Sequence, residues 1–147
     1  MKPKYIPLVL VCFLLFGLAV QVITRQIQQE RLQKRRIILG DLFFKGRVIN
    51  SKIYDYGGRN YRLVCLKLDS GNRKDLYIFN DRCAIKIKDS IATFSAGGDD
   101  PNFVIDYIMV NVQKNVSTYH YKNGNTTTDV IDLEPQGLSV SDMNFCR

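Results

Sequence analysis

The sequence contains a single histidine, His120. A Ser–His–acid or Cys–His site would have to use this residue, and a metal site built on two histidines is excluded. No two of the four cysteines are spaced Cys-x-x-Cys, so thiolates do not replace the missing histidine ligands. His120 lies between two strand-favouring tyrosines, which is typical of an ordinary strand residue. The sequence therefore predicts no catalytic residue, no metal and no cofactor.

Clustered carboxylates occur at one place, the run GGDDPN at residues 97–102. Paired carboxylates can perform acid–base chemistry, so a hydrolase using Asp99 and Asp100 is one alternative. A calcium site would need more oxygen ligands at a fixed spacing. Gly, Asp, Pro and Asn are all turn formers, and the run is expected to be a solvated turn.

The body of the chain has almost no net charge, although the whole chain carries +7. Residues 37–147 hold 14 basic and 13 acidic side chains. This balance removes the main electrostatic argument for a nucleic-acid partner. The excess positive charge lies in residues 1–36 and comes from Lys2, Lys4, Arg25, Arg31, Lys34, Arg35 and Arg36.

Charged side chains are absent from residues 5–24, which are almost entirely apolar. Twenty helical residues span about 30 Å, the thickness of a bilayer core. Residues 1–24 are therefore predicted to be a transmembrane anchor whose partner is the lipid bilayer, with the basic residues as its flanks. The alternative is a cleaved signal peptide with a cleavage site near residues 17–19.

The charge count leaves two orientations open. Counted strictly, the lysines and arginines after the apolar run place the domain in the cytoplasm. A short basic N-terminus before one apolar helix is instead typical of an exported, anchored protein, and large domains translocate largely regardless of charge. The expectation is a single-pass membrane protein of the cell envelope with its domain on the periplasmic side.

Residues 25–36 are rich in helix formers and contain neither Gly nor Pro. A basic helical stalk over residues 25–41, ended by Gly40, is expected. From Phe43 the pattern changes to short β-rich runs separated by Gly, Asn and Asp turns. We therefore predict an antiparallel β domain over residues 42–134 and an irregular tail over residues 135–147.

Three features set the expected strand positions. The first run, residues 43–56, should bend near Gly46 or Asn50. In residues 83–88 the alternation directs Cys83, Ile85 and Ile87 to the core and the lysines at 86 and 88 to water. Asn123-Gly124 is a strong hairpin signal. The fold class predicted is mostly β: an N-terminal transmembrane helix plus a small antiparallel β-barrel or roll of five to seven strands.

The cysteines allow one disulfide in the β domain. Cys65 and Cys83 lie in predicted strands that could be neighbours, so a Cys65–Cys83 bond is open, with a buried thiol role for each as the alternative. Cys146 is expected to be a free thiol.

The segment IKIKDSI, residues 85–91, resembles the I-K-V-G-D-S-I segment of membrane-anchored small β-barrel proteins of Gram-negative bacteria. Lys88 stands where those proteins have Gly, which puts the form of the following turn in doubt. The resemblance covers about residues 44–110. It implies the same architecture and supplies no activity, because none is assigned to that family.

Tyrosine and arginine gather in residues 54–62. Surfaces that bind single strands or sugars stack bases or rings on such side chains, although Tyr is also simply favoured in strands. The function expected is a non-enzymatic binding module for a protein or another envelope component. The alternatives are an oligosaccharide- or single-strand-binding barrel and the hydrolase described above. The candidate surface comprises Tyr54, Tyr56, Arg59, Tyr61 and Arg62.

Overall fold

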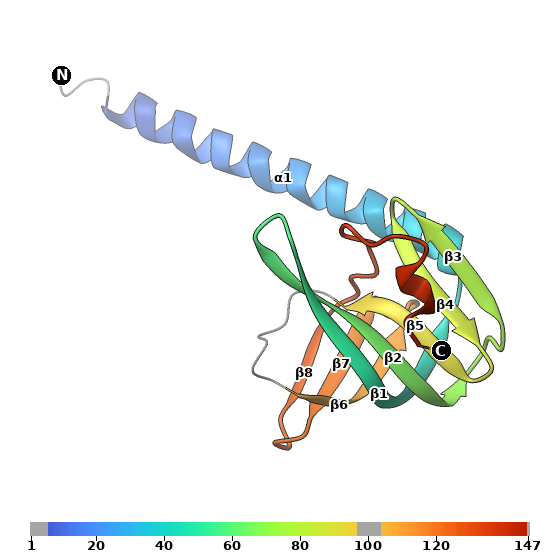
Figure 1. Ribbon diagram of the computed structural model, residues 1–147. Helices are drawn as coiled ribbons and strands as arrows, with labels where there is room; N and C mark the ends of the chain where they lie inside the picture. The colour runs from blue at the N-terminus through green and yellow to red at the C-terminus, as the bar shows by residue number, and fades with distance from the viewer. Residues whose placement is uncertain (1–5, 97–103, 147) are drawn as a thin grey trace.

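A computed structural model describes residues 6–96 and 104–146, with the side chains of all of these except 6–12, 28, 31–32 and 35–36. Helix α1 spans Ile6–Leu39 and projects from one side of a β domain (Figure 1). Gly40 follows the last helical residue and has φ of +60°. Glycine suits this position because a residue without Cβ adopts the left-handed conformation at little cost.

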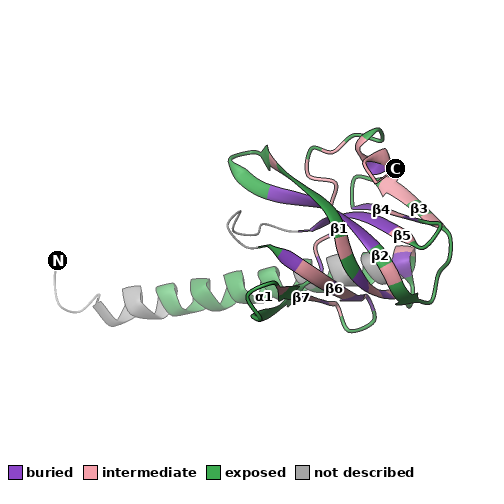
Figure 2. Ribbon diagram, turned by 60° about the horizontal axis from the view of Figure 1, so that its bottom comes forward, coloured by how far each residue is buried: buried purple, intermediate pink, exposed green. Residues whose placement is uncertain are grey.

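The structure contradicts the predicted transmembrane anchor. Within the described part of the chain, no helix is both long and apolar enough to cross a membrane. The predictions of a single-pass membrane protein and of a periplasmic domain on a membrane anchor are therefore wrong. Figure 2 shows that residues 13–27 of α1 are exposed.

Eight antiparallel strands form one sheet in the order β3-β4-β5-β2-β1-β6-β7-β8. The two long strands, β1 and β2, form its centre and extend as a hairpin beyond their neighbours (Figure 1). The strands are β1 Phe43–Tyr56, β2 Arg59–Gly71, β3 Leu76–Asn80, β4 Cys83–Lys88, β5 Ile91–Ala96, β6 Ile105–Asn111, β7 Val116–Tyr121 and β8 Thr126–Val130.

The core lies on the concave face of this curved sheet, which we call the inner face. Every second side chain of each strand points to this face and contributes to the core. For example, Ile85 of β4, Phe94 of β5 and Val64 of β2 are direct neighbours across three strands and are buried. Cys83, Ile85 and Ile87 are buried, as the sequence predicted. Strand β1 bends where its register shifts, at Lys45/Gly46 and again at Val48/Asn50, which confirms the predicted bend.

The predicted barrel of five to seven strands is also wrong, because the sheet has eight strands and is open. In the described residues β3 and β8 are its two edges and no ladder joins them. Strand β8 stops at Val130, and Ile131 and Leu133 turn inward as buried core residues. Ala84 N–H donates to Leu133 O at 2.7 Å. This irregular segment, rather than strand pairing, covers the open side of the core.

The disulfide is not the Cys65–Cys83 bond that the sequence left open. Cys65 is bonded to Cys146, with 5.7 Å between their Cα atoms, so the chain end is not a free thiol. Cys83 remains a buried thiol. The physical reason is the pleat: Cys83 shares the inner face with Ile85 and Ile87, whereas Cys65 pairs with Thr93 on the opposite, outer face. Side chains on opposite faces of one sheet cannot be bridged.

Candidate functional site

Four of the five residues of the predicted tyrosine–arginine surface share one face of the β1–β2 hairpin. Tyr54 lies opposite Tyr61, and Tyr56 lies opposite Arg59. The rings of Tyr54 and Tyr61 stack with centroids 5.9 Å apart. Arg62 points to the other face and is buried, and Tyr61 is buried as well. The two stacked tyrosines are therefore packed against each other instead of forming an open stacking platform.

The Tyr54 hydroxyl is held inside this cluster, 3.0 Å from Ser95 Oγ. Burial raises the pKa of the phenol above its ordinary value of 10.0. The hydrogen bond to Ser95 acts in the opposite sense, and the negative charges of Asp132 and Asp142 add to the rise. The neutral phenol is thus the form that fits the fold.

We expect alkaline pH to destabilise the protein through Tyr54. A folded pKa above the unfolded one contributes stability that is fully present below pH 10 and is lost as pH rises through the folded pKa. Denaturant midpoints at pH 9 and pH 11 should fall less steeply with pH in Tyr54→Phe than in the parent chain. All other residues are the same in the two proteins, so their contributions cancel in this difference. Equal pH dependence in the two proteins would contradict the assignment.

The remaining predicted residues that the structure describes do not converge on a site. His120 is exposed, shares a 3.1 Å hydrogen bond with Thr126 Oγ1, and stands edge-on to Tyr107. Asp99 and Asp100 lie outside the described residues, as do Lys2, Lys4 and the side chains of Arg31, Arg35 and Arg36. Arg25 and Lys34 are exposed, and Lys34 Nζ lies 3.9 Å from Glu30. Among the described residues, no cluster could hold a metal ion.

A different site is built on the outer face of β3, β4 and β5. Strand register places Tyr77, Lys86 and Thr93 side by side across these three strands. Lys88 follows two residues after Lys86 and therefore lies on the same face, opposite Ile91. The row thus combines an exposed aromatic ring, two ammonium groups and a buried hydroxyl.

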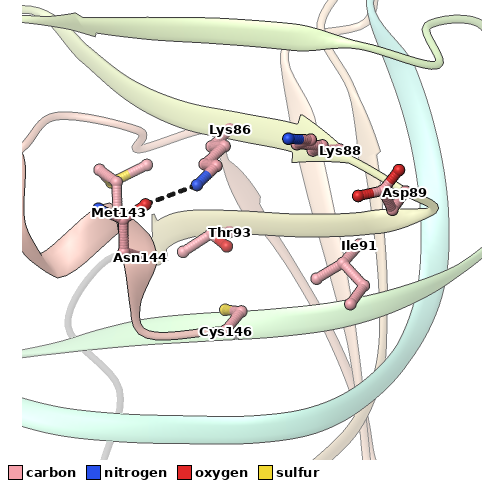
Figure 3. A pocket seen from close by; sticks show the side chains of 8 residues that line it. All are labelled: Lys86, Lys88, Asp89, Ile91, Thr93, Met143, Asn144 and Cys146. Atoms are coloured by element: carbon pink, nitrogen blue, oxygen red, sulfur yellow. Dashed lines mark hydrogen bonds between the residues drawn. The ribbon is translucent and has the colours of Figure 1, made fainter.

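The C-terminal segment supplies the wall above this row. We call residues 135–146 the strap; it includes the short 3-10 helix η2, Asp142–Asn144. Met143 is buried, and Lys86 Nζ donates a 2.7 Å hydrogen bond to Asn144 Oδ1, drawn in Figure 3. Cys146 lies beside Thr93 and is fixed to β2 by its disulfide.

Two hollows of about 310 and 410 Å³ lie beside the Lys86–Asn144 hydrogen bond. Both are lined by Lys86, Lys88 and Asn144, so we treat them as one site, the Lys86 trough. Each is within the usual range for a small-molecule pocket. The trough is lined by Asp75, Leu76, Tyr77, Lys86, Ile87, Lys88, Asp89, Ile91, Thr93, Met143, Asn144 and Cys146.

The trough combines two cationic side chains with two acidic residues near one of them, Lys88. Lys86 and Lys88 line both hollows, whereas Asp89 lines the smaller and Asp75 the larger. Lys86 is half-buried, so its ammonium group is partly shielded from water. An ammonium group has three N–H donors, and Asn144 accepts one of them. The arrangement can hold an anionic group beside Lys86 and hydrogen-bond donors of a ligand beside the two aspartates.

Sequence reasoning missed the trough because one of its walls is in the tail. Lys86 and Lys88 were expected merely to face water, and Met143, Asn144 and Cys146 were assigned to an irregular segment. A cysteine one residue from the chain end was the available signal, because a disulfide there would fasten the tail to the domain.

The chain is thus an antiparallel β-sheet protein with a disulfide-fastened C-terminal strap. Comparison with protein-family models, curated proteins and solved structures finds no match to it. The resemblance of residues 85–91 to anchored barrel proteins accordingly stays a prediction. In this structure Lys88 ends β4, and the turn into β5 consists of Asp89 and Ser90, both with positive φ.

Proposed function

We propose that this chain is a non-enzymatic binding module that holds a small organic anion in the Lys86 trough. The observation that carries the proposal is that Lys86, Lys88 and Asn144 line both hollows, with Lys86 hydrogen-bonded to Asn144. Hydrogen bonds from ammonium groups to carboxylates or phosphates are charge-assisted and about twice as strong as neutral ones. Partial burial of Lys86 strengthens them further.

The walls suggest the shape of the rest of the ligand. Ile91 and Met143 provide apolar contact in the smaller hollow, and the Tyr77 ring lies beside Lys86 in the larger. Aromatic side chains favour flat partners that can stack on them. The ligand class that fits is therefore a flat, apolar body with one carboxylate or phosphate group.

The test is a titration of the full oxidised chain with phenyl phosphate and with benzoate, followed by calorimetry or by NMR shifts of the Lys86 region. Benzyl alcohol is the uncharged comparison. We expect both anions to bind more tightly than benzyl alcohol, and the stronger of the two to identify the preferred anionic group. Equal affinity for all three compounds, or no binding, would overturn the proposal.

Lys86→Met should weaken binding of phenyl phosphate by about tenfold or more, because hydrogen bonds to charged groups contribute about 1.5–3 kcal/mol. Methionine keeps most of the side-chain length and removes the ammonium group. The matched control is Lys114→Met, which removes the same charge from an exposed position in the β6–β7 turn. If both variants weaken binding equally, the effect is one of net charge and the trough is not the site.

A further inference from the structure

The strap covers a face that would otherwise be open to water. Strand register places Leu63 and Cys65 of β2 and Thr93 and Ser95 of β5 on the outer face, yet all four are buried. The strap lies over this face, as Figure 1 shows, and its Cys146 is bonded to Cys65. Removing the strap would therefore expose apolar and hydroxyl side chains together with the floor of the trough.

The strap is fastened at its two ends by contacts of different kinds. Near its start, Gly137 has φ of +82° and lies against the ring of Tyr56, so closely that a Cβ there would collide with it. Near its end, Asn144 accepts the hydrogen bond from Lys86, Met143 is buried, and Cys146 is covalently bound to Cys65. Only the disulfide among these links is covalent, and whether it is formed or reduced depends on redox conditions.

One sulfur of the disulfide is within reach of solutes. Cys146 lines the smaller hollow and is partly exposed, whereas Cys65 is fully buried. Thiol–disulfide exchange begins with attack of a thiolate on an accessible sulfur. A dithiol would therefore attack Sγ of Cys146, and not Sγ of Cys65.

We propose that the Cys65–Cys146 disulfide is a redox latch that controls the Lys86 trough; this inference rests on the proposed function. A dithiol reductant attacks Sγ of Cys146, forming a mixed disulfide while Cys65 leaves and takes up a proton. The second thiol of the reductant then displaces Cys146 as a thiol. Two electrons and two protons pass to the protein, and the dithiol becomes a disulfide.

Reduction unfastens the end of the strap and thereby removes a wall of the trough. Leu133 stays in place because it belongs to the core and accepts the Ala84 hydrogen bond, so release is confined to residues after it. The Asn144 amide and the Met143 side chain then lie over the trough for a fraction of the time. Apparent affinity falls in proportion to that fraction, so a strap seated about one tenth of the time gives a tenfold loss.

The experiment compares binding of phenyl phosphate by the full chain before and after treatment with dithiothreitol, with circular dichroism to verify that the sheet remains folded. We expect about tenfold weaker binding after reduction. Cys146→Ser should bind as weakly as the reduced chain, with or without dithiothreitol. That control separates this disulfide from any other action of the reductant.

Hydrogen exchange of the strap is measured on the same samples and needs no ligand. Backbone N–H groups of Asp142, Met143 and Phe145 are hydrogen-bonded in the oxidised chain and should exchange faster after reduction. No binding by the oxidised chain would overturn the proposed function alone. Unchanged exchange and unchanged affinity after reduction would overturn the latch alone.

Discussion

Phe94→Ala is expected to lower the free energy of unfolding by about 3–5 kcal/mol, the range found when a buried phenylalanine is truncated. The side chain is 1% exposed and lies on β5 between the inner faces of β4 and β2. Its ring meets the ring of Phe44 edge-on, with centroids 5.4 Å apart and planes at 70°. Truncation therefore removes apolar burial, an aromatic pair and the support of a second ring on β1.

The measurement is equilibrium unfolding in urea followed by circular dichroism, because the chain has no tryptophan to report on the core. Phe13→Ala is the matched control: this phenylalanine is 72% exposed on α1, and its loss should change stability by less than about 0.5 kcal/mol. Phe94→Leu should lie between the two. A loss below about 1 kcal/mol for Phe94→Ala would show that the inner face of β5 is not packed as described.

Features set by local sequence were predictable. The alternation in β4 placed Cys83, Ile85 and Ile87 in the core, because the pleat directs every second side chain to one face. Asn123-Gly124 predicted the turn between β7 and β8, and Gly124 has the positive φ that such a turn requires. Both signals depend on residues a few positions apart, so one sequence contains all the information.

Features set by distant contacts were not predictable. Cys65 and Cys146 are 81 residues apart, and nothing near either one indicates which partner it has. The inward turn of Ile131 and Leu133 depends on Ala84 and on the core, so the exposed β8 and the buried segment after it read as one continuous strand. The candidate site was not predictable for the same reason: β4 and β5 form its floor, and its wall is the strap, which is distant from them in the sequence.

The bend in β1 leads to the second large expected effect, that of Gly46→Ala. Gly46 lies at a register shift between β1 and β2 while also pairing with Ile108 of β6. A Cβ at this position would overlap the carbonyl oxygen of Lys67 and lie 2.9 Å from Cα of Leu68. These atoms are backbone, so no side-chain rotation relieves the overlap and the central strands must shift apart.

We expect Gly46→Ala to cost about 3 kcal/mol of unfolding free energy, the upper end of the usual range for overpacking, because backbone must move. Gly17→Ala is the control, since a Cβ at Gly17 of α1 meets no atom within 4 Å and Ala is the better helix former. Urea unfolding of both variants should show a lowered midpoint only for Gly46→Ala. Parent-like stability of Gly46→Ala would mean that β1 and β2 do not approach so closely at this bulge. The same bulge brings the chain from the core into the long β1–β2 hairpin, so the strap's contact at Tyr56 should also loosen in this variant.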